Sequence, residues 1–229
     1  MEGTTYPKGG VLNAVENREV EFKSLAGAPP GMLPWKVMEL AKKFICGCLN
    51  AGDRKGTIYF GVGDSQEQCS KYKRGEILGL GIESIIDDMV QAFQNVLNDH
   101  VKSDAGPLQK GGEQNCVNME FVPVGNQESH PGLYVIEIEV KRDWKFCKDH
   151  IYYCKTWEDK GRGRADEDKD TPEKKNLKYF YDVKKNEYDD VVIRTFGSSN
   201  SVKQDKVHFH VKEPLMEGYA KWQREAKLG

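Results

Sequence analysis

The chain has 229 residues, of which 38% are hydrophobic and 31% are charged, a composition typical of a soluble protein with a real core. No apolar run approaches the roughly 20 residues that cross a bilayer, and the N-terminal MEGTTYPKGG lacks the basic-then-apolar layout of a secretion signal. The net charge of −2 excludes a protein that attracts nucleic acid through its overall charge, so any such role depends on local basic patches.

The N-terminal part of the chain alternates strand and helix patterns. Residues 19–24 (EVEFKS) carry hydrophobic side chains at every second position, which predicts a half-buried strand. A Pro/Gly-rich loop follows at 27–34. Apolar residues then recur at helical spacing, so we predict a helix over 35–49. Residues 57–62 (TIYFGV) predict a buried strand soon after it.

The middle of the chain predicts one more helix and three more strands. Residues 83–98 place seven apolar side chains on one helical face. Strands are predicted at 117–124, at 133–140 and around 152–154, where β-branched and aromatic residues concentrate.

Residues 155–178 have a different composition, with 8 Lys/Arg, 7 Asp/Glu and almost nothing apolar, and we expect a mobile insertion there. Strand-like segments follow at 179–183, 189–195 and 207–211. The chain ends in KWQREAKLG, an amphipathic stretch that predicts a C-terminal helix and suggests a domain of a larger multidomain protein. Two main helices amid about six strands predict a single α+β (mixed α/β) domain over 1–229.

Three motifs, taken together, resemble the Schlafen core and the divergent AlbA_2 domains. ENREVEFKS (16–24) is similar to the opening E-x4-E-F-K motif of that family, and GTIYFGVGD (56–64) is similar to its core strand. VIRTFGSSNSV (192–202) is similar to its later strand and turn. The resemblance covers roughly 16–100 and 117–202, and it implies a single Schlafen-like lobe. In length and divergent details it is nearest to the effector domains of sterile alpha motif domain-containing proteins.

The resemblance implies a site of three carboxylates. In ribonuclease-active Schlafen proteins, the two glutamates of the opening motif and the aspartate after the core strand hold the metal, and they correspond here to Glu16, Glu21 and Asp64. Such oxygen ligands suit Mg²⁺ or Mn²⁺. Glu16 and Glu21 are five residues apart, so the chain has to bend before Val20 for them to converge. Surface charges and a turn aspartate remain the alternative interpretation.

A second group of candidates is basic and would contact phosphates. Its members are Lys23, Lys42, Lys43, Arg54, Lys55, Lys71, Lys73 and Arg74. Solvated surface lysines are the ordinary alternative for most of them. Arg194 is the sharper candidate, because Ser198 and Ser199 follow it closely and such small residues let backbone N–H groups and hydroxyls approach a phosphate.

The six cysteines are few for this length and indicate a cytoplasmic protein without a disulfide framework. Cys147, His150 and Cys154 offer three zinc-type ligands, but no clear fourth is present and the spacing fits no common template. We therefore expect buried cysteines rather than a zinc site. His208 and His210 alternate along a predicted strand, where exposed histidines are the default.

Two functions share these residues. The first is nucleic-acid binding, to double-stranded DNA or structured RNA such as tRNA, in the antiviral and translation-control setting that the resemblance implies. The second is a Mg- or Mn-dependent endoribonuclease acting on tRNA through the three carboxylates. A protein-interaction module is a third interpretation, favoured if 155–178 were the functional surface.

GVGD is followed by neither Gly-Lys-Ser/Thr nor a G-x-G-x-x-G helix start, so we expect no nucleotide cofactor.

Overall fold

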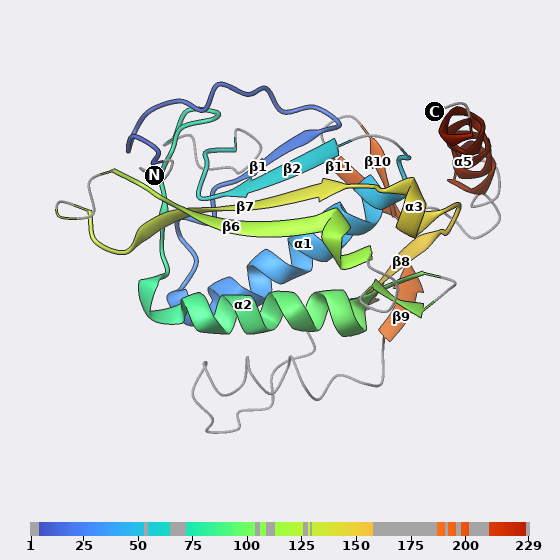
Figure 1. Cartoon of the computed structure of the whole chain (residues 1–229). Coiled ribbons are helices and arrows are strands. Elements are labelled where there is room, and N and C mark those ends of the chain that lie inside the picture. The colour runs from blue at the N-terminus through green and yellow to red at the C-terminus, as the bar shows by residue number, and fades with distance from the viewer. Residues whose placement is uncertain are drawn as a thin grey trace.

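The computed structural model describes residues 5–52, 55–64, 72–103, 106–108, 113–125, 128, 130–157, 187–190, 192–195, 198–201 and 211–227. In its main sheet β1 pairs with β2, β2 and β3 pair with successive parts of one edge of β7, and β6 pairs along the opposite edge of β7 (Figure 1). These strands are β1 (Val20–Lys23), β2 (Lys55–Phe60), β3 (Leu80–Gly81), β6 (Val117–Pro123) and β7 (Leu133–Lys141).

Strands β1 and β2 are parallel neighbours, joined by the helix α1 (Leu33–Leu49). Their register places Val20 beside Thr57 and Lys23 beside Phe60. A parallel pair needs a crossover connection, and the long apolar stripe of α1 supplies one that packs back onto the sheet. All other pairings in this sheet are antiparallel.

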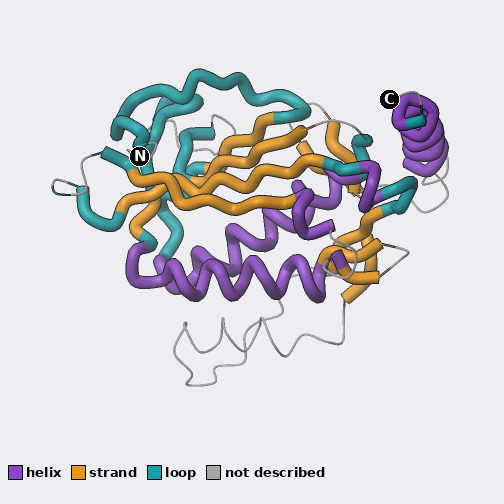
Figure 2. The backbone as a smooth tube through the Cα atoms, viewed as in Figure 1, coloured by secondary structure: helices purple, strands orange, loops and turns teal. Residues whose placement is uncertain are grey.

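The two faces of the sheet are covered differently (Figure 2). Helices α1 and α2 (Ile86–Asn95) lie against one face and form the large core with side chains such as Ile58, Phe60, Ile136 and Ile138. A smaller core on the opposite face packs Phe22, Val62, Ile77, Val124 and Val135 beneath the N-terminal segment. That segment is attached by backbone hydrogen bonds along residues 75–77 and to the end of β6.

A second sheet lies beyond the end of α2, in the order β5-β4-β8-β9. Its strands are β4 (Val101–Ser103), β5 (Gly106–Pro107), β8 (Tyr152–Trp157) and β9 (Glu187–Asp190). A hairpin of β10 (Val192–Thr195) and β11 (Ser198–Ser201) packs against α1. The described part of the chain also contains the helices α3 (Trp144–Cys147) and α5 (Glu213–Ala226), short 3-10 turns at Pro30–Met32, Glu83–Ile85 and Glu113–Cys116, and a π turn at Val96–His100.

Arg142, at the end of β7, joins the two sheets. It is 4% exposed, and its guanidinium stacks over the rings of Trp144 and Tyr152 at 4.6 and 5.5 Å. The same guanidinium donates hydrogen bonds to four backbone carbonyl oxygens, those of Leu49, Cys147, Lys148 and His150. One buried cation therefore holds the C-terminal end of α1, the α3 turn and the approach to β8.

The predicted α+β class is confirmed, and the main helices and sheet strands fall where the periodicity predicted them. The sequence analysis missed β3, β4, β5, β11 and α3, which are too short for a periodic signal, and the single strand predicted over 189–195 is two strands, β9 and β10. It also started the charged insertion too early, because β8 continues to Trp157 and pairs there with β9. The predicted strand over 207–211 is wrong at Val211, which begins a helical segment, and 158–186 and 207–210 lie outside the described residues.

Among the described residues, no helix has the length and apolar character required to cross a membrane.

Replacing Arg142 by Met should remove the donors of four carbonyl oxygens while keeping an apolar stem against the two rings. Buried acceptors that lose their donors are costly, so we expect a loss of at least about 3 kcal/mol in the free energy of unfolding, measured by urea denaturation. The matched control is Lys141→Met at the exposed neighbouring position, expected within about 0.5 kcal/mol of the wild type. Equal effects of the two variants would contradict this role of Arg142.

Candidate functional site

A tight turn brings Glu16 back onto strand β1. The Asn17 side chain accepts hydrogen bonds from the backbone N–H groups of Glu19 at 2.6 Å and Val20 at 3.0 Å, and the Asn17 N–H donates to the carbonyl of Val20. An Asn side chain that bonds to nearby backbone in this way stabilises a turn. The bend that convergence of Glu16 and Glu21 requires is therefore present, immediately before β1.

Glu16 is buried and has two partners. Its Oε1 accepts a hydrogen bond from the backbone N–H of Phe22 at 3.1 Å, and its Oε2 pairs with the guanidinium of Arg74 at 2.5 Å. Strand β1 is an edge strand, so the Phe22 N–H points away from β2 and would otherwise have no strand partner. Glu16 thus closes the free edge of β1, and Arg74 balances its charge.

Asp64 follows the end of β2 on a loop that only glycines allow. Gly61 has a φ of +87°, in the left-handed region, and a Cβ on Gly63 would lie 2.3 Å from the carbonyl oxygen of Lys73. Backbone hydrogen bonds tie Gly61 to the carbonyl of Lys23 and Gly63 to that of Glu76. The loop therefore holds Asp64 beside the C-terminal end of β1.

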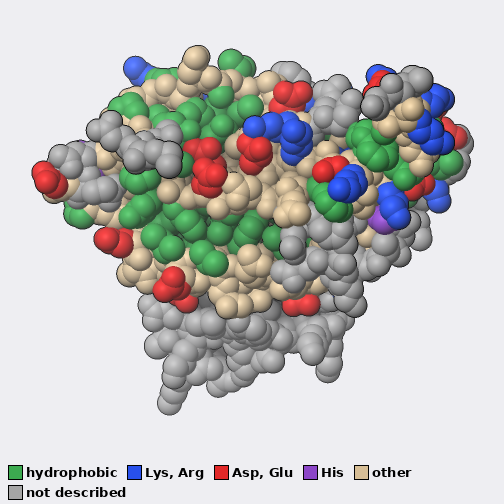
Figure 3. Space-filling view, viewed as in Figure 1, with side chains coloured by type: hydrophobic (Ala, Val, Ile, Leu, Met, Phe, Trp, Pro, Cys, Tyr) green, Lys and Arg blue, Asp and Glu red, His purple; other side chains and the backbone are tan. Residues whose placement is uncertain are grey.

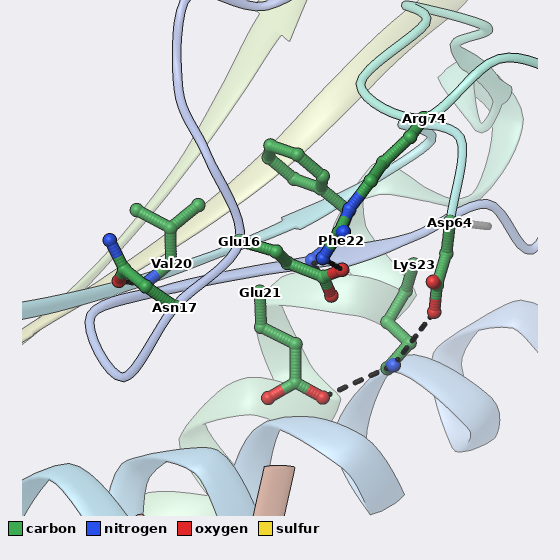
Figure 4. Close-up of polar contacts among 8 residues, drawn as sticks. All are labelled: Glu16, Asn17, Val20, Glu21, Phe22, Lys23, Asp64 and Arg74. Atoms are coloured by element: carbon green, nitrogen blue, oxygen red, sulfur yellow. Dashed lines mark hydrogen bonds and ion pairs between the residues drawn. The ribbon is translucent and has the colours of Figure 1, made fainter. Parts of the chain in front are cut away.

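Lys23 lies between the other two carboxylates (Figure 4). Its Nζ is 3.2 Å from Oε1 of Glu21 and 3.1 Å from Oδ2 of Asp64. The three side chains are largely buried, and that of Asp64 is only 2% exposed. Burial acts to lower the pKa of Lys23, but the attraction of Glu21 and Asp64 and their hydrogen bonds outweigh it, so this pKa is raised. Lys23 is therefore a protonated cation shared by two carboxylates at neutral pH.

The structure brings the three predicted carboxylates to the same end of β1 but does not arrange them around one metal position. Glu16 is directed to Arg74 and the Phe22 N–H, whereas Glu21 and Asp64 share Lys23. Within the described part of the chain, no group of three or more His, Cys, Asp or Glu side chains is arranged to hold a metal ion. As arranged, these residues do not fit Mg²⁺ or Mn²⁺, because protein cations already compensate all three carboxylates.

The basic candidates have different surroundings. The prediction that Lys42 contacts phosphate is wrong. Its side chain is 1% exposed and pairs with Glu39 at 2.5 Å, and burial lowers the pKa of Lys42. Lys23 is likewise engaged by carboxylates rather than exposed. Lys55 pairs with Glu139 across neighbouring strands, on the opposite face of the sheet from α1.

The remaining basic candidates are partly or fully exposed, lie on the β10–β11 hairpin, or fall outside the described residues. Lys43 is partly exposed on α1, and Lys73 and Arg74 are exposed beside Glu16. The β10–β11 hairpin pairs Arg194 directly with Ser199 and places Ser198 opposite Thr195. Arg54 and Lys71 lie outside the described residues.

The three candidate zinc-type ligands, Cys147, His150 and Cys154, do not form a metal-binding group in the described structure. Cys147 is buried, and its Sγ lies 3.4 Å from that of Cys116, a residue that the sequence analysis did not consider. This hydrogen bond lowers the pKa of Cys147 and raises that of Cys116. Cys154 is buried on β8, where it is paired with Val101. His208 and His210 lie outside the described residues.

The charge pairs of the site were not predicted, although the pair of Glu21 and Lys23 left a signal in the sequence. Residues two apart on a strand share a face, so Glu21 and Lys23 in EVEFK were already placed to form a pair. The pairing of Arg74 with Glu16 spans 58 residues and depends on how the N-terminal segment lies along residues 75–77, which no local pattern reveals.

Glu16→Ala should destabilise the domain by about 2–3 kcal/mol, because it leaves the buried Phe22 N–H without an acceptor. Arg74→Ala should cost about 1 kcal/mol or less, since the Arg74 side chain is 46% exposed and water can replace it. Urea denaturation of both variants and of the double variant measures these losses. A Glu16→Ala loss no larger than that of Arg74→Ala would show that the edge of β1 does not depend on the carboxylate.

A comparison of the chain with profiles of known protein families agrees with the order of its motifs. The sequence profile of the family described as Schlafen, AlbA_2 matches residues 16–200, which include β1, α1, β2 and the β10–β11 hairpin. No curated protein matches the chain at a significant level, so the closer resemblance to the effector domains of sterile alpha motif domain-containing protein 9 and its 9-like paralogue is not confirmed. Because the family profile matches most of the chain, the chain belongs to the Schlafen AlbA_2 family.

Proposed function

We propose that this domain binds double-stranded DNA or structured RNA such as tRNA, mainly through phosphate contacts that do not depend on sequence. Membership of the Schlafen AlbA_2 family suggests a function related to nucleic acid. The observation that carries the proposal is the packing of the β10–β11 hairpin on α1, which joins the backbone of Arg194 and Ser199 to the helix that bears Lys43. Such a surface suits a backbone of phosphates.

The distribution of charge favours this side of the molecule over the opposite sheet face. Glu120, Glu137 and Glu139 are near neighbours on the face away from α1, and burial raises the pKa of Glu137, with Glu120 and Glu139 adding to that rise. Figure 3 shows acidic side chains among apolar ones on the side that it draws, without a continuous basic patch. A phosphate backbone would be repelled there, so Lys55 is a weaker candidate than Lys43 or Arg194.

In this proposal the domain is the nucleic-acid-binding effector part of a larger cytoplasmic protein that acts in antiviral defence and translational control. Lys73 and Arg74 add two exposed cations near the acidic centre, which consists of Glu16, Glu21 and Asp64. Binding by charge and shape predicts a steep dependence on salt.

A second candidate function is a Mg- or Mn-dependent endoribonuclease acting on tRNA. The observation that favours it is the convergence of Glu21 and Asp64 on one cation, Lys23, with Glu16 at the same end of β1. A bound divalent ion would offset charge on a scissile phosphate. The present side-chain arrangement does not accommodate that ion, so this activity requires a rearrangement of Lys23.

Charge reversal of Lys43 or Arg194 should weaken binding of duplex DNA, duplex RNA or tRNA by about 3- to 10-fold at moderate salt and reduce the slope of log affinity against log salt by about 1. Fluorescence anisotropy across a salt series measures both quantities. Lys141→Glu, an exposed lysine at the end of β7, is the charge-matched control and should bind almost as the wild type does. Equal effects of the variants and the control at every salt concentration would refute the proposed surface.

Asp64→Ala should leave nucleic-acid affinity within about twofold of the wild type, because Asp64 is buried and carries no phosphate-binding charge. If the domain cleaves tRNA in Mn²⁺, the same variant should abolish that cleavage. Gel analysis of labelled tRNA with the domain and with the full-length protein checks this expectation. Absence of cleavage by both wild-type proteins with any divalent ion would end the nuclease alternative and leave the binding proposal untouched.

A further inference from the structure

The ammonium group of Lys23 lies between two buried carboxylates, those of Glu21 and Asp64. Its ammonium lies 3.2 Å from Glu21 and 3.1 Å from Asp64, and all three side chains are at least four-fifths removed from solvent. A compact ammonium is a point charge with three donors, and it serves two separate carboxylate oxygens well. The side chain of a strand residue therefore supplies the charge that a metal ion would supply in a carboxylate site.

We propose that Lys23 is an internal counter-cation that competes with divalent metal for Glu21 and Asp64. The ammonium keeps the centre free of metal in the resting domain, and a metal ion binds there only when Lys23 is displaced. This inference goes beyond nucleic-acid binding, and it holds whether or not the domain cleaves RNA.

The physical chemistry of the centre supports competition rather than shared occupancy. Two positive charges within about 4 Å of each other repel strongly in a site with little water. Mg²⁺ also requires oxygens at about 2.0–2.1 Å and gives up its water reluctantly, so a preformed lysine pair is hard to replace. A buried carboxylate without a counter-charge is costly, and so Glu21 and Asp64 need one of the two cations.

The position of Lys23 makes the competition local. It is fixed on β1, two residues from Glu21 and on the same strand face, while the Gly61–Asp64 loop is tied to the carbonyl of Lys23 by backbone hydrogen bonds. Its stem therefore keeps the ammonium near both carboxylates in the folded state. Arg74 has the corresponding role for Glu16, at a more exposed position.

The experiment titrates Mn²⁺ into the domain without nucleic acid and measures binding by water proton relaxation and calorimetry. Lys23→Met removes the charge and keeps the apolar stem, and it should tighten Mn²⁺ binding by about tenfold or more. Lys23→Arg retains a cation and should remain as weak as the wild type. The matched control, Lys141→Met, removes an exposed lysine at the end of β7 and should not tighten binding.

Adding Asp64→Asn to Lys23→Met should abolish the gain, because it removes one of the two carboxylates that would hold the ion. Wild-type binding as tight as that of Lys23→Met would overturn the proposal, as would a gain that survives Asp64→Asn. These outcomes are separate from those of the nucleic-acid titrations, which contain no added divalent metal.

Circular dichroism first establishes that Lys23→Met is folded. If it is not, ¹⁵N-labelled lysine in the wild type provides the decisive measurement by NMR. The Lys23 ammonium signal, assigned with Lys23→Arg, should shift only as Mg²⁺ occupies the centre at millimolar concentration. Mg²⁺ occupancy detected at the Asp64 amide while the Lys23 signal stays unchanged would refute competition.

Discussion

The parallel pairing of β1 with β2 is the constraint on which the acidic centre depends. Because α1 returns the chain to the same end of the sheet, the C-terminal ends of both strands lie side by side. Lys23 ends one strand, and Asp64 follows the other after a loop of three residues that contains two glycines. An antiparallel pair would have placed these residues at opposite ends of the sheet, where no contact between them is possible.

Around this pairing, every buried charge of the centre has a partner. Glu16 is balanced by Arg74 and by the Phe22 N–H, and Lys23 balances Glu21 and Asp64. Buried charges are tolerated only with such compensation, and removing the largely buried Lys23 would leave Glu21 and Asp64 with a large desolvation cost. The same compensation explains how three carboxylates sit at one end of a strand in a domain whose family is associated with nucleic acid, since the protein itself neutralises their repulsion of phosphate.

Much of the fold followed from periodicity, and the exceptions have physical reasons. The helices at Leu33–Leu49 and Ile86–Asn95 and the strands at Val117–Pro123 and Leu133–Lys141 are long enough to show their apolar face. Short elements such as β3 and α3 depend on tertiary contacts and left no such pattern. Lys42 illustrates a different failure, because its position off the apolar stripe suggested solvent, whereas α1 is packed on more than one side and buries it against Glu39.

The sequence alone determined the class of the domain, its main elements and the need for a bend before Val20 if Glu16 and Glu21 are to converge. Those features depend on local spacing and on residue type, which a linear chain displays directly, whereas the three carboxylates were singled out only by the resemblance to the Schlafen family. Only the tertiary structure decided which charges meet: Arg74 reaches Glu16 across 58 residues, and Asp64 reaches Lys23 across 41. Such pairs depend on strand direction, on glycine loops and on the course of the N-terminal segment, so the assignment of counter-charges in the acidic centre required the fold.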